Sequence, residues 1–103
     1  MAVQAPDSAA VLDDVRRLQG ASDPPFDDVE RVLTDGYACV MRAEGERRRL
    51  RGRLEEQAAT MGDGQIEEIA ALAQGIARAG SEIDELRSEL GKLAARARTL
   101  RTD

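Results

Sequence analysis

The last third of the chain carries an unbroken heptad repeat, which restricts the fold more than any other feature of the sequence. From Ile69 onward, apolar residues recur in alternating steps of three and four. The repeat consists of Ile69, Leu72, Ile76, Ala79, Ile83, Leu86, Leu90, Leu93, Ala97 and Leu100. A repeat of about 3.5 residues keeps one seam of a helix facing a partner helix as the two supercoil. We therefore expect residues 65–102 to form one helix of a coiled coil.

A second long helix is expected over residues 25–61, and its heptad repeat has faults. One seam position reads Phe26, Leu33, Val40, Arg47, Leu54 and Met61, and the other reads Val29, Gly36, Ala43, Leu50 and Gln57. Arg47 and Gln57 are the polar faults. The two helices are separated by Gly62-Asp63-Gly64, in which both glycines allow a tight turn. Two long helices joined by so short a turn pack as antiparallel neighbours.

The turn also predicts which residues face each other. With its centre at Asp63, the numbers of facing residues sum to about 126, since helix positions on either side of a tight turn pair in reverse order. The predicted pairs are Phe26 with Leu100, Leu33 with Leu93, Gly36 with Leu90, Leu54 with Leu72, and Arg47 with Ala79 beside Gly80. The same register places Asp27, Asp28 and Glu30 across from Arg96, Arg98 and Arg101. Complementary charges of this kind favour one direction and register.

A short first helix is expected over residues 8–19. Asp7 or Ser8 provides an N-cap, and Gly20 is a C-terminal stop signal. The apolar residues Val11, Leu12, Val15 and Leu18 share one face. The break over residues 20–25 is short, so this face can fold back onto the base of the hairpin. The predicted fold is all-α: an antiparallel coiled-coil helical hairpin with a short N-terminal helix packed on its base. We expect residues 1–6 to be disordered and residues 7–103 to form a single helical domain.

Composition argues against several classes of function. Cys39 is the only cysteine and there is no histidine, which excludes an intramolecular disulfide and the common Cys/His zinc sites. We expect Cys39 to be a buried apolar filler. No glycine-rich phosphate loop or pocketed pair of carboxylates is visible, so we expect neither an enzyme nor a cofactor, metal or small-molecule substrate. The N-terminus lacks a signal peptide and no apolar run could span a membrane, so we expect a cytoplasmic protein.

The apolar residues that a two-helix seam does not need point to a protein partner. At the base, Val32, Tyr37 and Met41 widen the apolar face of the second helix. We expect the short helix to cover part of this face, Tyr37 included. Alanines at positions 70, 73, 77 and 94 give the third helix a second, shallow stripe. The predicted partner interface contains Val32, Tyr37, Met41, Ala73, Ala77 and Ala94. We expect an interaction or oligomerisation module that forms a homodimer, or a heterodimer with a similar helical protein.

An arginine-rich run keeps a nucleic-acid function open as the alternative. Residues 47–53 read Arg-Arg-Arg-Leu-Arg-Gly-Arg, bracketed by Glu44, Glu46, Glu55 and Glu56. Glutamates three or four residues away neutralise arginines on a helix surface, and no aromatic platform for bases lies nearby. We therefore do not expect this run to bind nucleic acid. The acidic tip around Asp63 is similar in shape to hairpins that transcription factors insert into RNA polymerase, which implies a polymerase-associated role.

A second alternative comes from length and outline. A chain of 103 residues with two antiparallel helices and a central glycine turn resembles the WXG class of type VII secretion substrates. That resemblance implies a secreted helical hairpin. The turn of this chain reads Met61-Gly62-Asp63-Gly64, where the class has its Trp-x-Gly motif.

Overall fold

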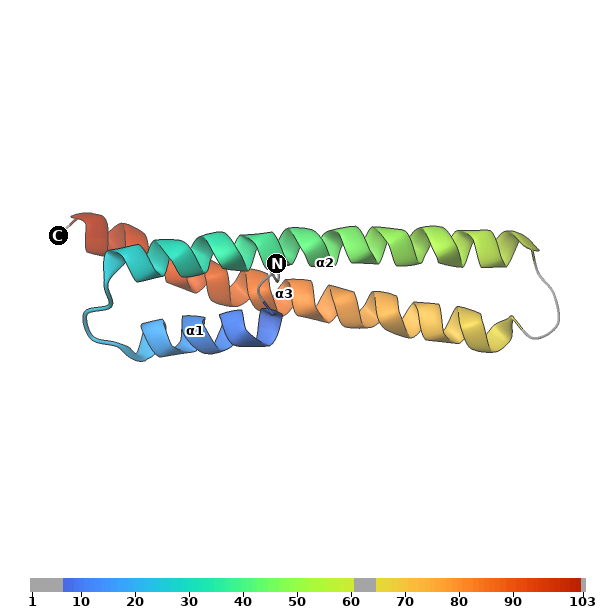
Figure 1. Ribbon diagram of the computed structural model, residues 1–103, viewed down its shortest axis with the longest axis horizontal. Helices are drawn as coiled ribbons and strands as arrows, with labels where there is room; N and C mark the ends of the chain where they lie inside the picture. Colours follow the sequence, from blue (N-terminus) through green and yellow to red (C-terminus); the bar gives the residue numbers. More distant parts are fainter. Residues whose placement is uncertain (1–6, 61–64, 103) are drawn as a thin grey trace, which may run out of the picture.

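The computed structural model describes residues 7–60 and 65–102, and it contains three α-helices and no strand in those residues. The helices are α1 (Ser8–Gly20), α2 (Phe26–Thr60) and α3 (Ile66–Thr102). Figure 1 shows α2 and α3 running antiparallel as a long hairpin, with α1 beside the end at which α2 begins. Most of the packing is between α2 and α3, and α1 contacts both of them. The predicted all-α hairpin is confirmed.

The ends of the helices follow the capping signals in the sequence. The Asp7 carboxylate accepts a hydrogen bond from the Ala9 N–H at 3.3 Å, which identifies Asp7 as the N-cap of α1. After Gly20 the backbone at Ala21 is extended, and its N–H donates to the Leu18 carbonyl. Helix α2 begins one residue later than predicted, at Phe26, directly after two prolines. The predicted turn at residues 61–64 lies outside the described residues.

The register between α2 and α3 agrees with the prediction. A Cβ on Gly36 would lie 2.9 Å from Leu90 Cδ1 and nearer still to Cδ2, so the two residues face each other directly. Further along the hairpin, a Cβ on Gly75 would lie 3.1 Å from Leu50 Cδ1. Arg47 approaches Gly80 in the same way, at 3.9 Å from such a Cβ. The arginine fault in the seam is thus accommodated where the facing helix has little bulk.

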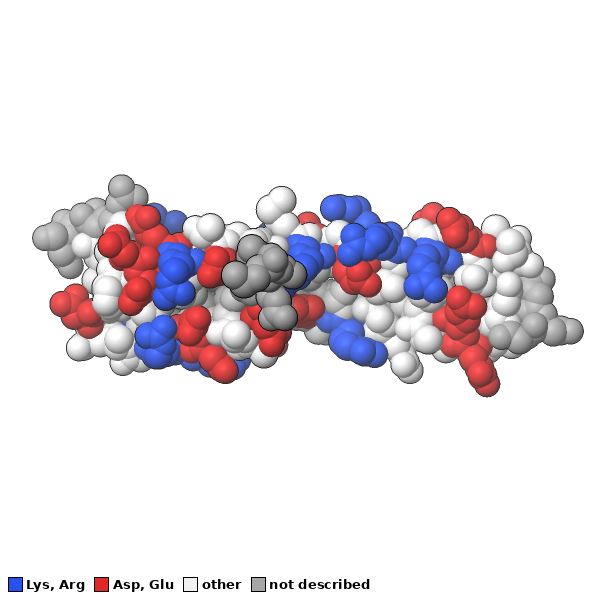
Figure 2. Space-filling model, viewed as in Figure 1, with Lys and Arg blue, Asp and Glu red and all other residues white. Residues whose placement is uncertain are grey.

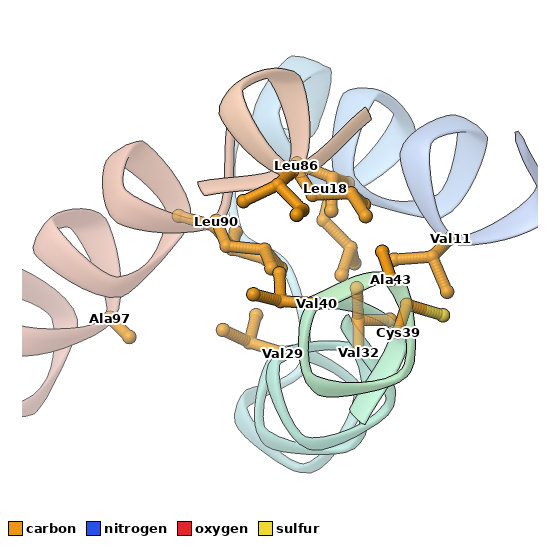
Figure 3. Packing of buried hydrophobic residues seen from close by; sticks show 13 residues of the cluster. Val11, Leu18, Val29, Val32, Cys39, Val40, Ala43, Leu86, Leu90 and Ala97 are labelled. Carbon is orange, nitrogen blue, oxygen red and sulfur yellow. The ribbon is translucent and has the colours of Figure 1, made fainter. Parts of the chain in front are cut away.

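The hydrophobic core lies in the half of the hairpin that α1 covers. Helix α1 contributes Val11, Val15 and Leu18; α2 contributes Val29, Val32, Cys39, Val40 and Ala43; α3 contributes Ile83, Leu86, Leu90, Leu93 and Ala97. Figure 3 shows these side chains converging from all three helices. Cys39 is 1% exposed, which confirms its prediction as a buried filler. We call this half of the molecule the base.

Beyond the base, α2 and α3 continue as a two-helix arm with a thinner core. Leu72 and Ala79 are still buried there, at 5% and 7% exposed. The other apolar seam residues described in the arm are only half-buried, and they are Leu50, Leu54, Ile69 and Ile76. The molecule measures 62 × 32 × 18 Å, as expected for a hairpin with a short third helix at one end. Two helices alone leave both flanks of their seam open to water.

The predicted charge pairing at the base is wrong for Arg96 and for Asp28. Arg96 does not reach across to the acidic start of α2. Its guanidinium donates instead to backbone carbonyls at the end of α1, at 2.6 Å from Leu18 O and 2.9 Å from Gln19 O. Asp28 lies 3.6 Å from Arg31 of its own helix. The predicted partner Arg101 lies outside the residues whose side chains are described.

Candidate interaction surface

Tyr37 and Met41 form an exposed apolar pair on the side of α2 that faces away from α1. Tyr37 is 43% exposed and Met41 is 72% exposed. Each stands two positions from Cys39, which corresponds to about 200° around a helix. Cys39 belongs to the same buried cluster as Val11 of α1 (Figure 3). The two side chains therefore point away from α1, and the expectation that Tyr37 packs under the short helix is wrong.

Three alanines of α3 lie on this same side of the hairpin. Glu82 and Arg96 mark the side of α3 that faces α1, because Glu82 accepts from Ser8 and Arg96 donates to carbonyls of α1. Ala73 stands nine residues before Glu82, which corresponds to about 180° around the helix, and Ala94 stands two residues before Arg96, which corresponds to about 200°. Both alanines therefore lie on the side of α3 opposite α1. Ala77, five residues before Glu82, lies about 140° from it.

The structure adds Ile66, which sequence analysis missed. Ile66 is 80% exposed at the first position of α3. It precedes Ala73 by seven residues, so the two lie on one face. The sequence contains a signal for this exposure. Ile66 falls outside the heptad repeat that begins at Ile69, so it is an isoleucine that does not face the seam. We name the surface made by Tyr37, Met41, Ile66, Ala73, Ala77 and Ala94 the α1-free face.

An ion pair crosses the hairpin on the α1-free face. Arg87 of α3 donates to Glu44 of α2. Glu44 follows Tyr37 by seven residues and Arg87 precedes Ala94 by seven, so both lie on the face already defined. Glu44 is the less exposed partner, with 28% of its side chain accessible against 57% for Arg87. This ion pair links α2 to α3, and along the hairpin it lies between the apolar residues Tyr37 and Met41 and the alanines of the arm.

Val32 does not belong to this surface, and its prediction as an interface residue is corrected. It is 1% exposed, because α1 packs over the part of α2 that carries it. Its side chain is part of the core at the base. The sequence showed that the apolar face of α2 is wide, and the structure shows which part of that width α1 covers.

The arginine run is balanced by nearby carboxylates. Arg49 lies 2.6 Å from Glu46 on the same helix, and Arg53 lies 3.7 Å from Glu68 on the facing helix. Figure 2 shows basic and acidic side chains intermixed along the visible face of the molecule. A nucleic-acid-binding surface presents a sustained basic stripe instead. The acidic tip at Asp63 lies outside the described residues.

The rest of the described surface offers shallow hollows. One lies at the end of the base, lined by Asp23, Pro24, Pro25, Phe26 and Leu100. Two more lie on the side of Glu82, one where the base meets the arm and one further along the arm. Within residues 7–60 and 65–102 there is no group of three or more Asp, Glu, Cys or His side chains placed to hold a metal ion. None of the helices in these residues is both long enough and apolar enough to cross a membrane.

Comparison of the chain with protein-family models, with curated protein sequences and with solved structures found no match.

Proposed function

We propose that this protein is a non-catalytic interaction module, in which α2 and α3 pair as an antiparallel coiled coil and the α1-free face binds a second copy of the chain. We propose that it acts in the cytoplasm, as expected from its sequence. The side chains that define the α1-free face are apolar, which suits contact with another protein.

The observation that carries the proposal is the exposure of Tyr37 and Met41. Tyrosine and methionine are enriched at protein interfaces, where their large apolar surfaces are removed from water. Burying one large apolar side chain contributes about 1.5–3 kcal/mol. Two such side chains one turn apart, on the exposed side of a helix rich in charged residues, form the natural centre of an interface.

The alanines of α3 supply the surroundings that this pair needs. Ala73 and Ala77 are exposed and Ala94 is half-buried. Small side chains let another helix approach closely, so that larger side chains of the partner fit between them. Because both kinds of residue lie on one face of one hairpin, two copies present complementary surfaces to each other. A closed pair of copies is the commonest assembly of soluble proteins, and two hairpins together make a four-helix bundle.

The seam residues support the coiled-coil part of the proposal. Leu86, Leu90 and Leu93 are fully buried, and Ile83 and Ala97 are nearly so. They occupy the alternating positions of the heptad repeat. In an antiparallel coiled coil these residues are knobs that fill holes in the facing helix.

Light scattering across a concentration series tests the proposal. The wild-type protein should have twice the mass of the 11.2 kDa chain at tens of micromolar. Met41→Glu places a charge at the centre of the α1-free face and should convert the dimer to a monomer. Tyr37→Ser should weaken it by about tenfold or more, as expected when an interface anchor is truncated.

Ala10→Glu is the matched control, because Ala10 is exposed on α1, on the opposite side of the hairpin. It adds the same charge and should leave the mass unchanged. A wild-type mass near 11.2 kDa at every concentration would disprove self-association. A dimer that Met41→Glu leaves intact would show that the contact lies elsewhere.

A further inference from the structure

Helix α1 is attached to the hairpin by far fewer contacts than those that join α2 to α3. It has 13 residues, of which Val11, Val15 and Leu18 are buried. The much longer pairing of α2 with α3 continues well beyond it, through Leu72 and Ala79. Isolated helices of this length are marginal in water, so α1 depends on docking for its order. Part of the seam between α2 and α3 therefore lies beyond the reach of α1 and is buried without it.

One side chain holds the C-terminal end of α1. Arg96 of α3 donates to the carbonyls of Leu18, Gln19 and Ala21. These carbonyls lie at or just beyond the C-terminal end of the helix, where the dipole is negative, and the Leu18 carbonyl also accepts from the Ala21 N–H. Arg96 is half-buried, so the guanidinium acts at a site partly shielded from water. A charged donor shared by three acceptors is a strong local attachment.

Two more contacts join α1 to α3, one at the N-terminal residue of α1 and one in its second half. Ser8 donates its hydroxyl to Glu82, and Arg16 lies 3.1 Å from Glu85. The Arg16 and Glu85 side chains are each more than half exposed, at 57% and 53%, so this pair contributes little. Beyond Gly20 the connector runs without helix as far as Pro25. Because the connector is not helical, no rigid helix joins α1 to α2.

We propose that α1 is a detachable cover, which swings away from the hairpin as one unit about the connector 21–25 while α2 and α3 stay paired, and that Arg96 is the latch that keeps it closed. Small sets of contacts around a separate element define the units that open locally in native proteins. Opening removes α1 from Val32, Cys39 and the α1-facing flank of the α3 leucines. This inference is independent of dimer formation through the α1-free face.

Cys39 is a built-in reporter of this motion. It is the only cysteine, it is 1% exposed, and it lies in the cluster that α1 closes. A thiol reagent added to the native full-length protein will therefore label Cys39 only when the cover opens or the whole chain unfolds. We expect labelling to be faster than global unfolding, whose rate is measured separately by circular dichroism after a jump into urea.

Arg96→Ala tests the latch. It should accelerate labelling of Cys39 by about tenfold or more, the effect expected for hydrogen bonds to a charged group. Arg98→Ala is the control: Arg98 is exposed two positions away, on the other side of α3, and its loss should leave the rate unchanged. A labelling rate equal to the global unfolding rate in both the wild type and Arg96→Ala would overturn the proposal.

Hydrogen exchange of the wild-type protein keeps the test decisive even if Arg96→Ala does not fold. Amides of residues 11–20 should exchange at least about a hundredfold faster than those of residues 83–93, since local opening requires far less free energy than global unfolding. Equal protection of the two segments would show that α1 and the hairpin open only together, and would refute the detachable cover.

Discussion

Gly36 of α2 lies directly against Leu90 of α3, with no room between them for even one methyl group. Both residues are buried, and Leu90 is completely inaccessible to water. The pair fixes the distance between the two helices at the base of the hairpin. It also fixes the register of the two helices, because the bulky Leu90 fits only opposite a residue as small as Gly36.

This relationship predicts the effect of filling the position. Gly36→Ala gains helix propensity, yet its methyl group collides with a leucine that neighbouring side chains hold in place. We expect a net loss of about 1–2 kcal/mol in the free energy of unfolding, because overpacking outweighs the propensity gain of about 1 kcal/mol. Gly52→Ala, in the same helix with nothing within 4 Å of the new Cβ, should instead stabilise the protein. Urea melts that show the same sign for both variants would contradict the contact.

Leu86 tests the seam. It is completely buried between the helices, so Leu86→Ala should lower the free energy of unfolding by about 2–4 kcal/mol. Arg49→Ala removes only a side chain that is 66% exposed and its pair with Glu46, and the change should stay below about 0.5 kcal/mol. Thermal melts followed by circular dichroism compare the two variants. Similar losses would mean that the buried seam does not carry the stability.

Arg47 is half-buried at a seam position and approaches Gly80 of the facing helix. Replacing it with leucine extends the apolar seam into the arm and should stabilise the protein by about 1 kcal/mol, since one more apolar side chain leaves water. Arg48→Leu makes the same replacement at an exposed neighbour and should have almost no effect. Denaturation in urea measures both changes. A destabilised Arg47→Leu protein would indicate that the guanidinium makes essential interactions.

Nucleic-acid binding should be weak. We expect no affinity tighter than about 10 μM at physiological salt, because carboxylates offset the arginine run that phosphates would need. Removing the carboxylates that pair with it, by Glu46→Gln and Glu68→Gln together, should strengthen binding and make it more dependent on salt. Fluorescence anisotropy with a labelled duplex measures both proteins. Sub-micromolar binding by the wild type would make the run a genuine site.

Local patterns in the sequence were sufficient to predict the hairpin. Steps of three and four residues place Leu86, Leu90 and Leu93 on one stripe of a helix, because 3.6 residues complete a turn. The capping residue Asp7 marked the start of the first helix. A glycine turn predicted at Asp63 then predicts the register of the long helices, since a short connection leaves the facing positions little freedom to slide. Gly36 opposite Leu90 followed from that register alone.

The candidate surface was only partly predictable. Its apolar residues stand out in the sequence, and Tyr37, Met41, Ala73 and Ala77 are indeed exposed. A hairpin, however, has two flanks, and the connector from α1 is long enough to reach either of them. Periodicity shows that the apolar face of α2 is wide, without showing which edge of it becomes core. For this reason the sequence predicts both Val32 and Tyr37 at the interface.

Only the tertiary structure decided which flank α1 covers. On the chosen flank, Arg96 meets the carbonyls at the end of α1 and Glu82 meets Ser8. These contacts join residues more than 70 positions apart in the chain, as the separations of 78 and 74 show. No local propensity encodes them, because they exist only once two long helices have set the position of a third. Docking on that flank buries Val32 and leaves Tyr37 in water.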